Sequence, residues 1–190
     1  MILILLASIL CITLIIERLW SLRRKKILPT KILSELDQLI RGGKKSDIVA
    51  LCRAADIPLT RILQAGAEAE GAIKAEIRNK MEMRGRSEAS GMEKYLNFLG
   101  TLATVGPLLG LLGTVTGMIQ TFAVIRVLGV GDPMKLSGGI AEALLSTAGG
   151  LIVGIPALIF QHYFLHRVEK YVMEMEEFSE RFLSLVSGEP

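Results

Sequence analysis

Three long stretches of this sequence almost entirely lack charge. Residues 1–16 and 95–125 contain no charged side chain, and residues 136–166 contain only Glu142. Apolar runs of more than about 18 residues are typical of membrane-spanning helices, and the first run reaches that length when its flank to residue 22 lies at the interface. The pattern leaves no room for a large soluble core. It predicts an all-α integral membrane protein with three transmembrane helices.

Cysteine and other reactive groups are also scarce. Cys11 falls in an apolar stretch and Cys52 in a charged one, so we expect no disulfide between them and interpret both as packing residues. His162 and His166 are four residues apart but have no third ligand nearby, so no metal or cofactor is predicted. The apolar stretches contain no catalytic constellation, and no Gly-Lys-Ser/Thr follows the glycines. An enzyme and a P-loop are therefore not expected.

Aromatic residues make up only 5% of the chain, and the charged region 23–94 mixes both signs. A nucleic-acid interface usually needs a basic surface with aromatic side chains, so we expect no nucleic acid as a partner. The region is better interpreted as solvated helices. Gly42-Gly43 should break them, Ser46 or Asp47 should cap the next helix, and Ile57-Pro58 should interrupt again. From Leu59 to Lys94 the pattern predicts one helix that continues into the second span.

Basic residues directly follow the first apolar stretch, at Arg18 and at 23–26. The stretch has no basic segment before it and no small-residue cleavage site, so a signal peptide is not expected. The positive-inside rule then predicts an external N-terminus and a cytoplasmic C-terminus, with Trp20 at the interface. The predicted segments are a first transmembrane helix (1–22), a cytoplasmic helical region (23–94), a second transmembrane helix (95–126), an external turn (127–137), a third transmembrane helix (138–165) and a cytoplasmic C-terminal helix (166–190).

Small residues form a stripe along the second and third spans at helical spacing. The first stripe contains Gly106, Gly110, Gly113 and Gly117, and the second contains Gly139, Ala143, Ser146, Gly150, Gly154 and Ala157. Helices with such stripes pack closely, backbone to backbone. Thr114 and Thr121 lie beside the first stripe, whereas Thr147 and Glu142 border the second. Packing alone accounts for the glycines, but the hydroxyls and the lone carboxyl also suit a path for something polar.

Two motifs resemble those of the MotA/TolQ/ExbB proton-channel family. They are GLLGTVTGM, which ends at Met118, and GIAEALLSTAGGL, which starts at Gly139. Three spans rather than four make the chain more similar to ExbB or TolQ than to MotA, and the loop 130–137 slightly favours ExbB. A tryptophan often follows the GTV motif in the family, but here Thr116 does.

The resemblance implies a pentamer in the bacterial inner membrane, with the second and third spans around a central pore. It also implies a dimeric ExbD- or TolR-like partner whose single-span helices enter that pore, and a TonB- or TolA-like protein beyond it. By the family motifs Thr114, Thr147 and Glu142 belong to the ion pathway, and we add the neighbouring hydroxyls of Thr121 and Ser146.

No carboxylate lies near the middle of any span, although proton relays usually need one. The resemblance supplies it as an aspartate of the partner. The hypothesis is therefore a proton-channel subunit of a motor that converts proton motive force into mechanical work for outer-membrane transport. A TolQ-like role in envelope maintenance and a non-conducting scaffold for partner helices are the alternatives.

Overall fold

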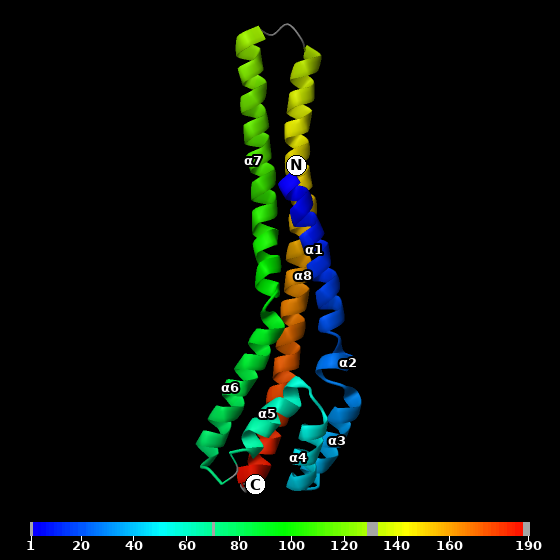
Figure 1. Cartoon of the computed structure of the whole chain (residues 1–190), viewed down its shortest axis with the longest axis vertical. Helices are drawn as coiled ribbons and strands as arrows, with labels where there is room; N and C mark the ends of the chain where they lie inside the picture. The colour runs from blue at the N-terminus through cyan, green and yellow to red at the C-terminus, as the bar shows by residue number, and fades with distance from the viewer. Residues whose placement is uncertain (1, 70, 129–132, 188–190) are drawn as a thin grey trace. The chain divides into compact units, whose positions relative to one another are not determined.

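The computed structural model describes residues 2–69, 71–128 and 133–187, which form eight α-helices and no strand (Figure 1). The prediction of an all-α fold is confirmed. The middle of the predicted turn 127–137, at residues 129–132, lies outside the described residues. The helices are α1 (Ile2–Ser21), α2 (Arg24–Ile27), α3 (Thr30–Arg41), α4 (Lys45–Ala54), α5 (Pro58–Ala67), α6 (Lys74–Glu93), α7 (Leu96–Leu128) and α8 (Pro133–Ser187).

Three helical segments are long and apolar enough to cross a bilayer, which confirms the prediction of three spans. They lie in Ile2–Ser21, Lys74–Arg126 and Ser137–Ser187. The chain divides into two compact units. The membrane unit comprises residues 1–18 and 95–163, and the polar unit comprises residues 19–94 and 164–190.

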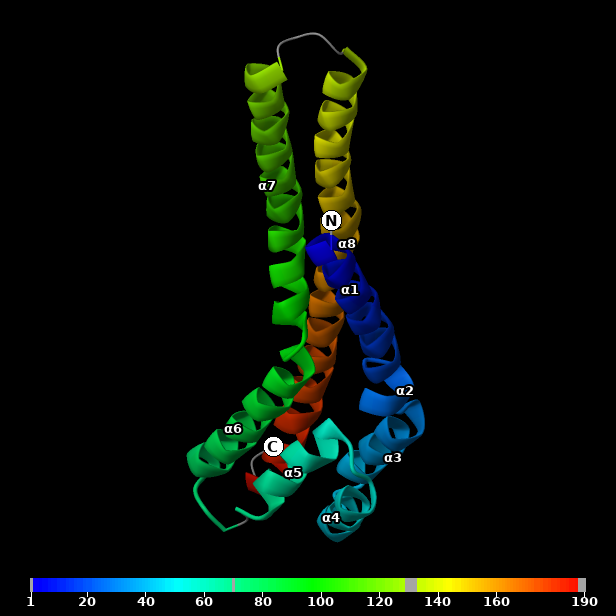
Figure 2. The same ribbon diagram turned by 45° about the horizontal axis from the view of Figure 1, so that its top comes forward.

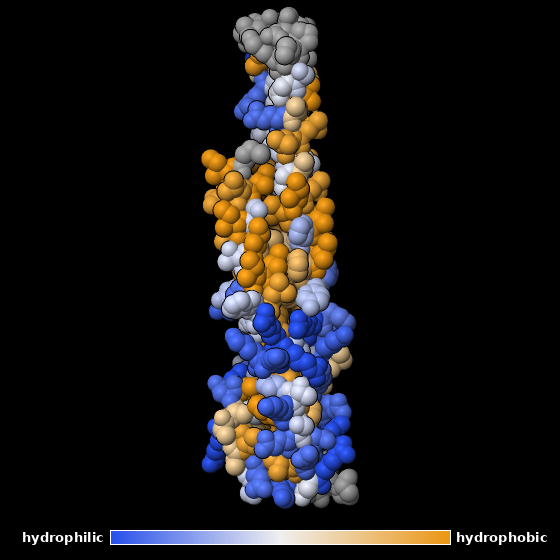
Figure 3. Space-filling model, turned by 90° about the vertical axis from the view of Figure 1, so that its right-hand side faces the viewer, coloured by the Kyte–Doolittle hydropathy of each residue, from blue (hydrophilic) through white to orange (hydrophobic). Residues whose placement is uncertain are grey.

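In the membrane unit, α7 and the N-terminal part of α8 run side by side, and α1 lies against α8 (Figures 1 and 2). The buried residues of α1 recur every three or four positions, as one face of a helix requires: Ile4, Ala7, Cys11, Ile15 and Arg18. Large apolar side chains cover the outer surface of the unit, among them Leu108, Ile119, Ile152 and Ile159. Figure 3 shows this apolar surface from one side, as its orange area. A continuous apolar surface of this kind is typical of contact with lipid or with other apolar protein surfaces.

The polar unit has a conventional buried core. Its fully buried side chains come from α3 to α6, from the residue after α2 and from the end of α8, and include Leu28, Leu36, Ile48, Leu59, Leu63, Ile77, Met175 and Phe182. Cys52 belongs to this core, and burial raises the pKa of its thiol to about 11. The thiol therefore stays protonated and packs as a small apolar group.

The prediction of one helix from Leu59 to Lys94 is wrong. α5 ends at Ala67 and α6 begins at Lys74, with Gly71 between them at a φ of +93° that favours glycine. The reversal lets α5 pack on α6 so closely that a methyl group added at Gly66 would lie 2.6 Å from Met81 Sδ. Burial of apolar side chains between α5 and α6 outweighs the helix propensity of the alanines here. Two further residues, 94–95, separate α6 from α7.

The predicted helix break at Gly42-Gly43 is confirmed, but the predicted cap is wrong. α3 ends at Arg41 and Gly43 has a φ of +65°. The next helix begins at Lys45, one residue before the expected cap, and no side chain caps its N-terminus. The Ser46 hydroxyl instead lies 3.3 Å from the Asp47 carboxylate. The interruption predicted at Ile57-Pro58 is confirmed, since α5 begins at Pro58.

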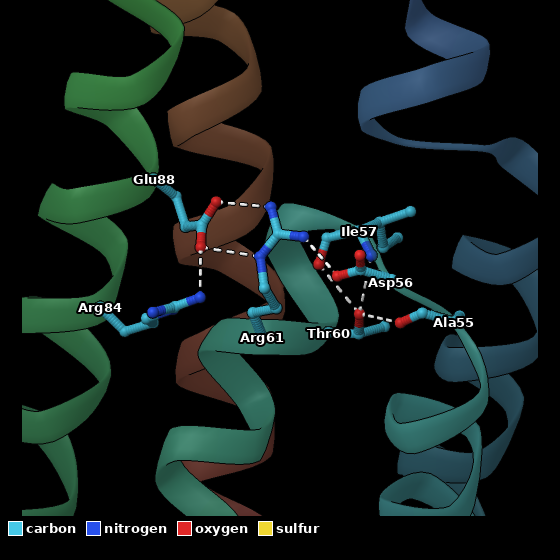
Figure 4. A network of polar contacts seen from close by, with 7 residues as sticks. All are labelled: Ala55, Asp56, Ile57, Thr60, Arg61, Arg84 and Glu88. Atoms are coloured by element: carbon cyan, nitrogen blue, oxygen red, sulfur yellow. Dashed lines mark hydrogen bonds and ion pairs between the residues drawn. The ribbon is translucent and has the colours of Figure 1, made fainter.

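An ion-pair network joins α5 to α6 (Figure 4). Arg61 donates two hydrogen bonds to Glu88, of 2.8 and 2.7 Å, and a further one to Asp56. Arg84 binds the same Glu88 carboxylate at 2.9 Å. The hydrogen bond to Glu88 raises the pKa of Arg61, so the guanidinium is charged at any pH of interest. The bidentate geometry and the 12% exposure of the Glu88 side chain make this pair stronger than an ordinary surface ion pair.

Replacing Arg61 with methionine should destabilise the polar unit by about 1–3 kcal/mol, because Glu88 loses a bidentate partner in a largely buried position. The matched control is Arg41→Gln, which removes an ion pair whose arginine is 76% exposed and should cost less than about 0.5 kcal/mol. Thermal unfolding of the two detergent-solubilised variants measures the difference. Equal melting temperatures would show that the network contributes nothing.

Candidate functional site in the paired apolar helices

The glycines of α7 and α8 lie against each other with no space for side chains. A methyl group added at Gly150 would lie 2.5 Å from the Gly106 carbonyl oxygen and 2.9 Å from Gly110 Cα. One added at Gly110 would lie 2.9 Å from the Ser146 carbonyl oxygen. Real carbon atoms do not approach this closely, and backbone atoms cannot rotate away as side chains do. The two helices are therefore in backbone contact over this segment.

The same contact continues toward both ends of the pair. A methyl group at Gly113 would lie 2.6 Å from Ser146 Cβ, and one at Gly117 would lie 2.9 Å from Ala143 Cβ. On α8, a methyl group at Gly139 would lie 2.5 Å from Thr121 Oγ1, and one at Gly154 would lie 2.6 Å from Pro107 Cδ. All seven glycines of the predicted stripes thus face the partner helix of the pair.

Two hydroxyl groups meet in the middle of this contact. Thr147 Oγ1 lies 3.3 Å from Thr114 Oγ1 and 3.2 Å from the Gly110 carbonyl oxygen, and Thr114 Oγ1 lies 2.7 Å from the Leu111 carbonyl oxygen. A hydroxyl has one proton to donate and two lone pairs that accept. Thr114 donates to Leu111, so Thr147 donates either to Thr114 or to Gly110. Both threonines are half-buried.

The other two hydroxyls of the candidate pathway are buried in the same contact. Thr121 Oγ1 donates to the Gly117 carbonyl oxygen at 2.9 Å, and Ser146 Oγ lies 3.4 Å from the backbone carbonyl oxygen of Glu142. Each hydroxyl thus has an acceptor in its own helix, an arrangement common for hydroxyls in membrane helices. Thr121 sits against Gly139 and Ser146 against Gly113, so both fill the helix contact.

Glu142 is placed differently from the hydroxyls. Its residue is exposed, and it precedes Thr147 by five positions, which puts the two on different faces of α8. The structure therefore brings Thr114 and Thr147 together but leaves the Glu142 side chain at the surface of the unit. Chemically, each hydroxyl of the pair can form hydrogen bonds with water or with a neighbouring group, but neither can hold a proton as a carboxylate can.

Two contacts of the membrane unit were not predicted from the sequence. Arg18 is only 3% exposed, lies 3.0 Å from the Glu17 carboxylate and stacks 4.6 Å from the centre of the Tyr95 ring. Gly100 lies against the side chain of Gln161, which extends the close contact of α7 and α8 beyond Gly106. Gly100 lies about 110° around α7 from the centre of the glycine stripe, so helical spacing gave no signal for the second contact. The pairing of Arg18 with a distant tyrosine had none either.

The family model of the MotA/TolQ/ExbB proton channel family matches residues 54–177. The chain belongs to this family. The matched range includes the whole contact between the glycine-rich helices and both threonines. The resemblance inferred from the two motifs is thereby confirmed, and the three apolar helices make this family member a multi-pass membrane protein.

Curated relatives with ExbB names and with TolQ names are both about 30% identical to this member of the family. It is 32% identical over 83% of its length to biopolymer transport protein ExbB-like 3 of Synechocystis, and it covers 76% of that protein. It is 33% identical to ExbB-like 1 of the same organism over 82% of its length, covering 62% of that protein. It is also 30% identical to the Tol-Pal system protein TolQ of Haemophilus influenzae over 67% of its length, covering 56% of that relative.

Proposed function

We propose that this chain is the proton-channel subunit of a motor in the bacterial inner membrane. It works with an ExbD- or TolR-like partner and converts proton motive force into mechanical work for outer-membrane transport. Five copies surround a pore lined by the second and third spans, and a dimer of the partner places its membrane helices inside. A TonB- or TolA-like protein carries the work onward.

The observation that carries this proposal is the hydroxyl pair of Thr147 and Thr114, 3.3 Å apart in the contact of two glycine-packed helices. A member of a proton channel family needs a polar path across an apolar unit. Within the apolar stretches the one carboxyl belongs to Glu142, and it lies near the start of α8 rather than at mid-depth. The chain therefore supplies hydrogen-bonding groups but not the group that holds the proton.

The proton is held by the partner in this account. A carboxylate of the partner helix takes up a proton opposite the ring of Thr114 and Thr147 hydroxyls, and Glu142 lies at the entrance. Neutralising the carboxylate changes its preferred position among the five subunits, and each transfer drives one step of rotation. A proton that crosses 100 mV yields about 2.3 kcal/mol, so sizeable work needs several protons.

Native mass spectrometry of the complex tests the proposed composition. The chain is expressed with and without the ExbD- or TolR-like protein of its own organism, and the masses are compared. We expect five copies alone and five copies with two partner chains together. A complex of any other composition would contradict the pore arrangement.

The relatives include both ExbB and TolQ proteins, and we favour the ExbB-like role because of the loop 130–137. Residues 130–132 of that stretch lie outside the described range and 133–137 form the start of α8, so its sequence alone supports the preference. The TolQ-like alternative is supported by the 30% identity to TolQ of Haemophilus influenzae. Identification of the partner that co-purifies from the native organism separates the two roles.

We further propose a periplasmic N-terminus, and this predicts the effect of neutralising the basic cluster after α1. Changing Arg23, Arg24, Lys25 and Lys26 together to glutamine should give a mixed orientation of α1, because these charges resist translocation. A cysteine introduced at Leu3 in a background with Cys11 and Cys52 replaced by alanine reports orientation through labelling by an impermeant maleimide. If this cysteine is protected from labelling in intact spheroplasts when all four basic residues are kept, the proposed topology is wrong.

A further inference from the structure

The segment that follows α1 presents a row of cations next to the only tryptophan of the chain. Trp20 is 67% exposed, and the guanidinium of Arg23 lies 5.5 Å from the centre of its ring. Arg23 precedes the short helix α2, on which Lys25 and Lys26 are exposed. All four residues belong to the polar unit.

The polar unit holds this segment firmly. Leu22 and Leu28, which flank the cations, are 1% and 0% exposed. The Tyr171 hydroxyl donates a 2.9 Å hydrogen bond to the Leu22 carbonyl oxygen. Arg24 forms a bidentate pair with Glu174 at 2.9 and 2.8 Å. These contacts fix the backbone on both sides of the row, so the cations have a defined position.

The contacts also divide the basic residues into two groups. Arg24 is neutralised by Glu174, whereas none of the residues that the structure describes forms an ion pair with Lys25 or Lys26. Arg23 contacts the Trp20 ring and no carboxylate within the same described part of the chain. Three cations on a fixed backbone are thus available to an external anion.

The position of these three cations in the sequence indicates which anion they bind. α1 is a membrane span that ends at Ser21, so the row begins within a few residues of the boundary between hydrocarbon and headgroups. Tryptophan is enriched at this depth, and basic residues beside a span attract acidic headgroups. We propose that Arg23, Lys25 and Lys26 form a binding site for the headgroup phosphates of acidic phospholipids, with Trp20 inserted beside the bound lipid.

The single tryptophan makes the test direct. The full chain is placed in bilayer nanodiscs of equal mole fractions of phosphatidylcholine and phosphatidylglycerol, with brominated acyl chains on one lipid or the other. Bromine quenches tryptophan fluorescence only at short range, so Trp20 reports which lipid lies beside it. We expect brominated phosphatidylglycerol to quench Trp20 more strongly, and the preference to fall by about fivefold or more in Lys25→Gln/Lys26→Gln, about the effect of one to two basic residues near an acidic surface.

The matched control is Lys44→Gln/Arg53→Gln, which removes two exposed cations from another part of the polar unit and should keep the preference. Raising the salt concentration on the unmodified chain should weaken the preference, which tests the site without any variant. Equal quenching by the two lipids in the unmodified chain, or the same loss in both double variants, would overturn the proposal. Phosphate binding that the unmodified chain shows and Lys25→Gln/Lys26→Gln loses, together with equal quenching by the two lipids, would assign the cations to a soluble phosphate and also overturn it.

Discussion

Replacing Gly150 with leucine should prevent α7 and α8 from packing, and little native assembly should form. Any side chain at this position collides with the Gly106 carbonyl oxygen at 2.5 Å and with Gly110 Cα at 2.9 Å. Both are backbone atoms, so the collision is relieved only by separating the helices. Overpacking in cores costs about 1–3 kcal/mol even where side chains can adjust. Separation here also breaks the hydrogen bond between Thr147 and Thr114.

The neighbouring glycine provides the control for this prediction. A methyl group at Gly149 would lie 3.6 Å from Ile4 Cγ2, which is an ordinary contact. Gly149→Ala should therefore keep the mass and melting temperature of the unmodified protein, whereas Gly150→Ala should already lower the melting temperature. Size-exclusion chromatography with light scattering and thermal unfolding measure both quantities. A Gly150→Leu protein with unchanged mass and stability would refute the backbone contact.

Thr147→Val should fold and assemble but lose most proton-driven function. Valine keeps the shape of threonine and removes the hydroxyl that lies 3.3 Å from Thr114 and 3.2 Å from the Gly110 carbonyl oxygen. Hydrogen bonds between membrane helices contribute only about 0.6 kcal/mol on average, so stability should change little. Loss of the hydroxyl would instead interrupt the proton path to the partner carboxylate. Rescue of outer-membrane transport in a strain that lacks the chain measures this function.

Two variants distinguish a lost path from a lost fold. Thr147→Ser keeps a hydroxyl and should retain much of the function. Thr116→Val is the positional control, because Thr116 is exposed and bonds only to carbonyl oxygens of its own helix, at 2.9 and 3.2 Å. It should behave as the unmodified chain. Thr114→Val should resemble Thr147→Val, with the double variant little worse. If Thr147→Val instead lost its assembly, the hydroxyl would have a structural role.

The membrane unit was predictable from sequence because its signals are local. The absence of charge predicted the three spans, and small residues at helical spacing predicted which faces of the second and third spans meet. Thr114 and Thr147 could be singled out because each borders a glycine stripe and falls in a family motif. Their separation of 3.3 Å could not, since it depends on the register of α7 against α8. The contacts between individual glycines of one helix and backbone carbonyl groups of the other set that register.

The polar unit was less predictable because its helices are short and its contacts distant. Alanine-rich sequence before Lys74 favours helix, yet Gly71 and the packing of Gly66 on Met81 reverse the chain there. The partner of Arg61 is 27 residues away and that of Arg24 is 150 residues away. Charge patterning along a single sequence does not identify such pairs, because every exposed helix carries similar charges.

Proton flux into reconstituted vesicles tests the central claim most directly. Vesicles with an imposed membrane potential contain the chain alone, the chain with its ExbD- or TolR-like partner, or the Thr147→Val chain with that partner. Internal pH is followed by an enclosed dye. We expect flux only for the unmodified chain with its partner, because the partner supplies the carboxylate and Thr147 supplies the path to it. Equal flux through the Thr147→Val complex, or no flux through any of the three, would contradict the central claim.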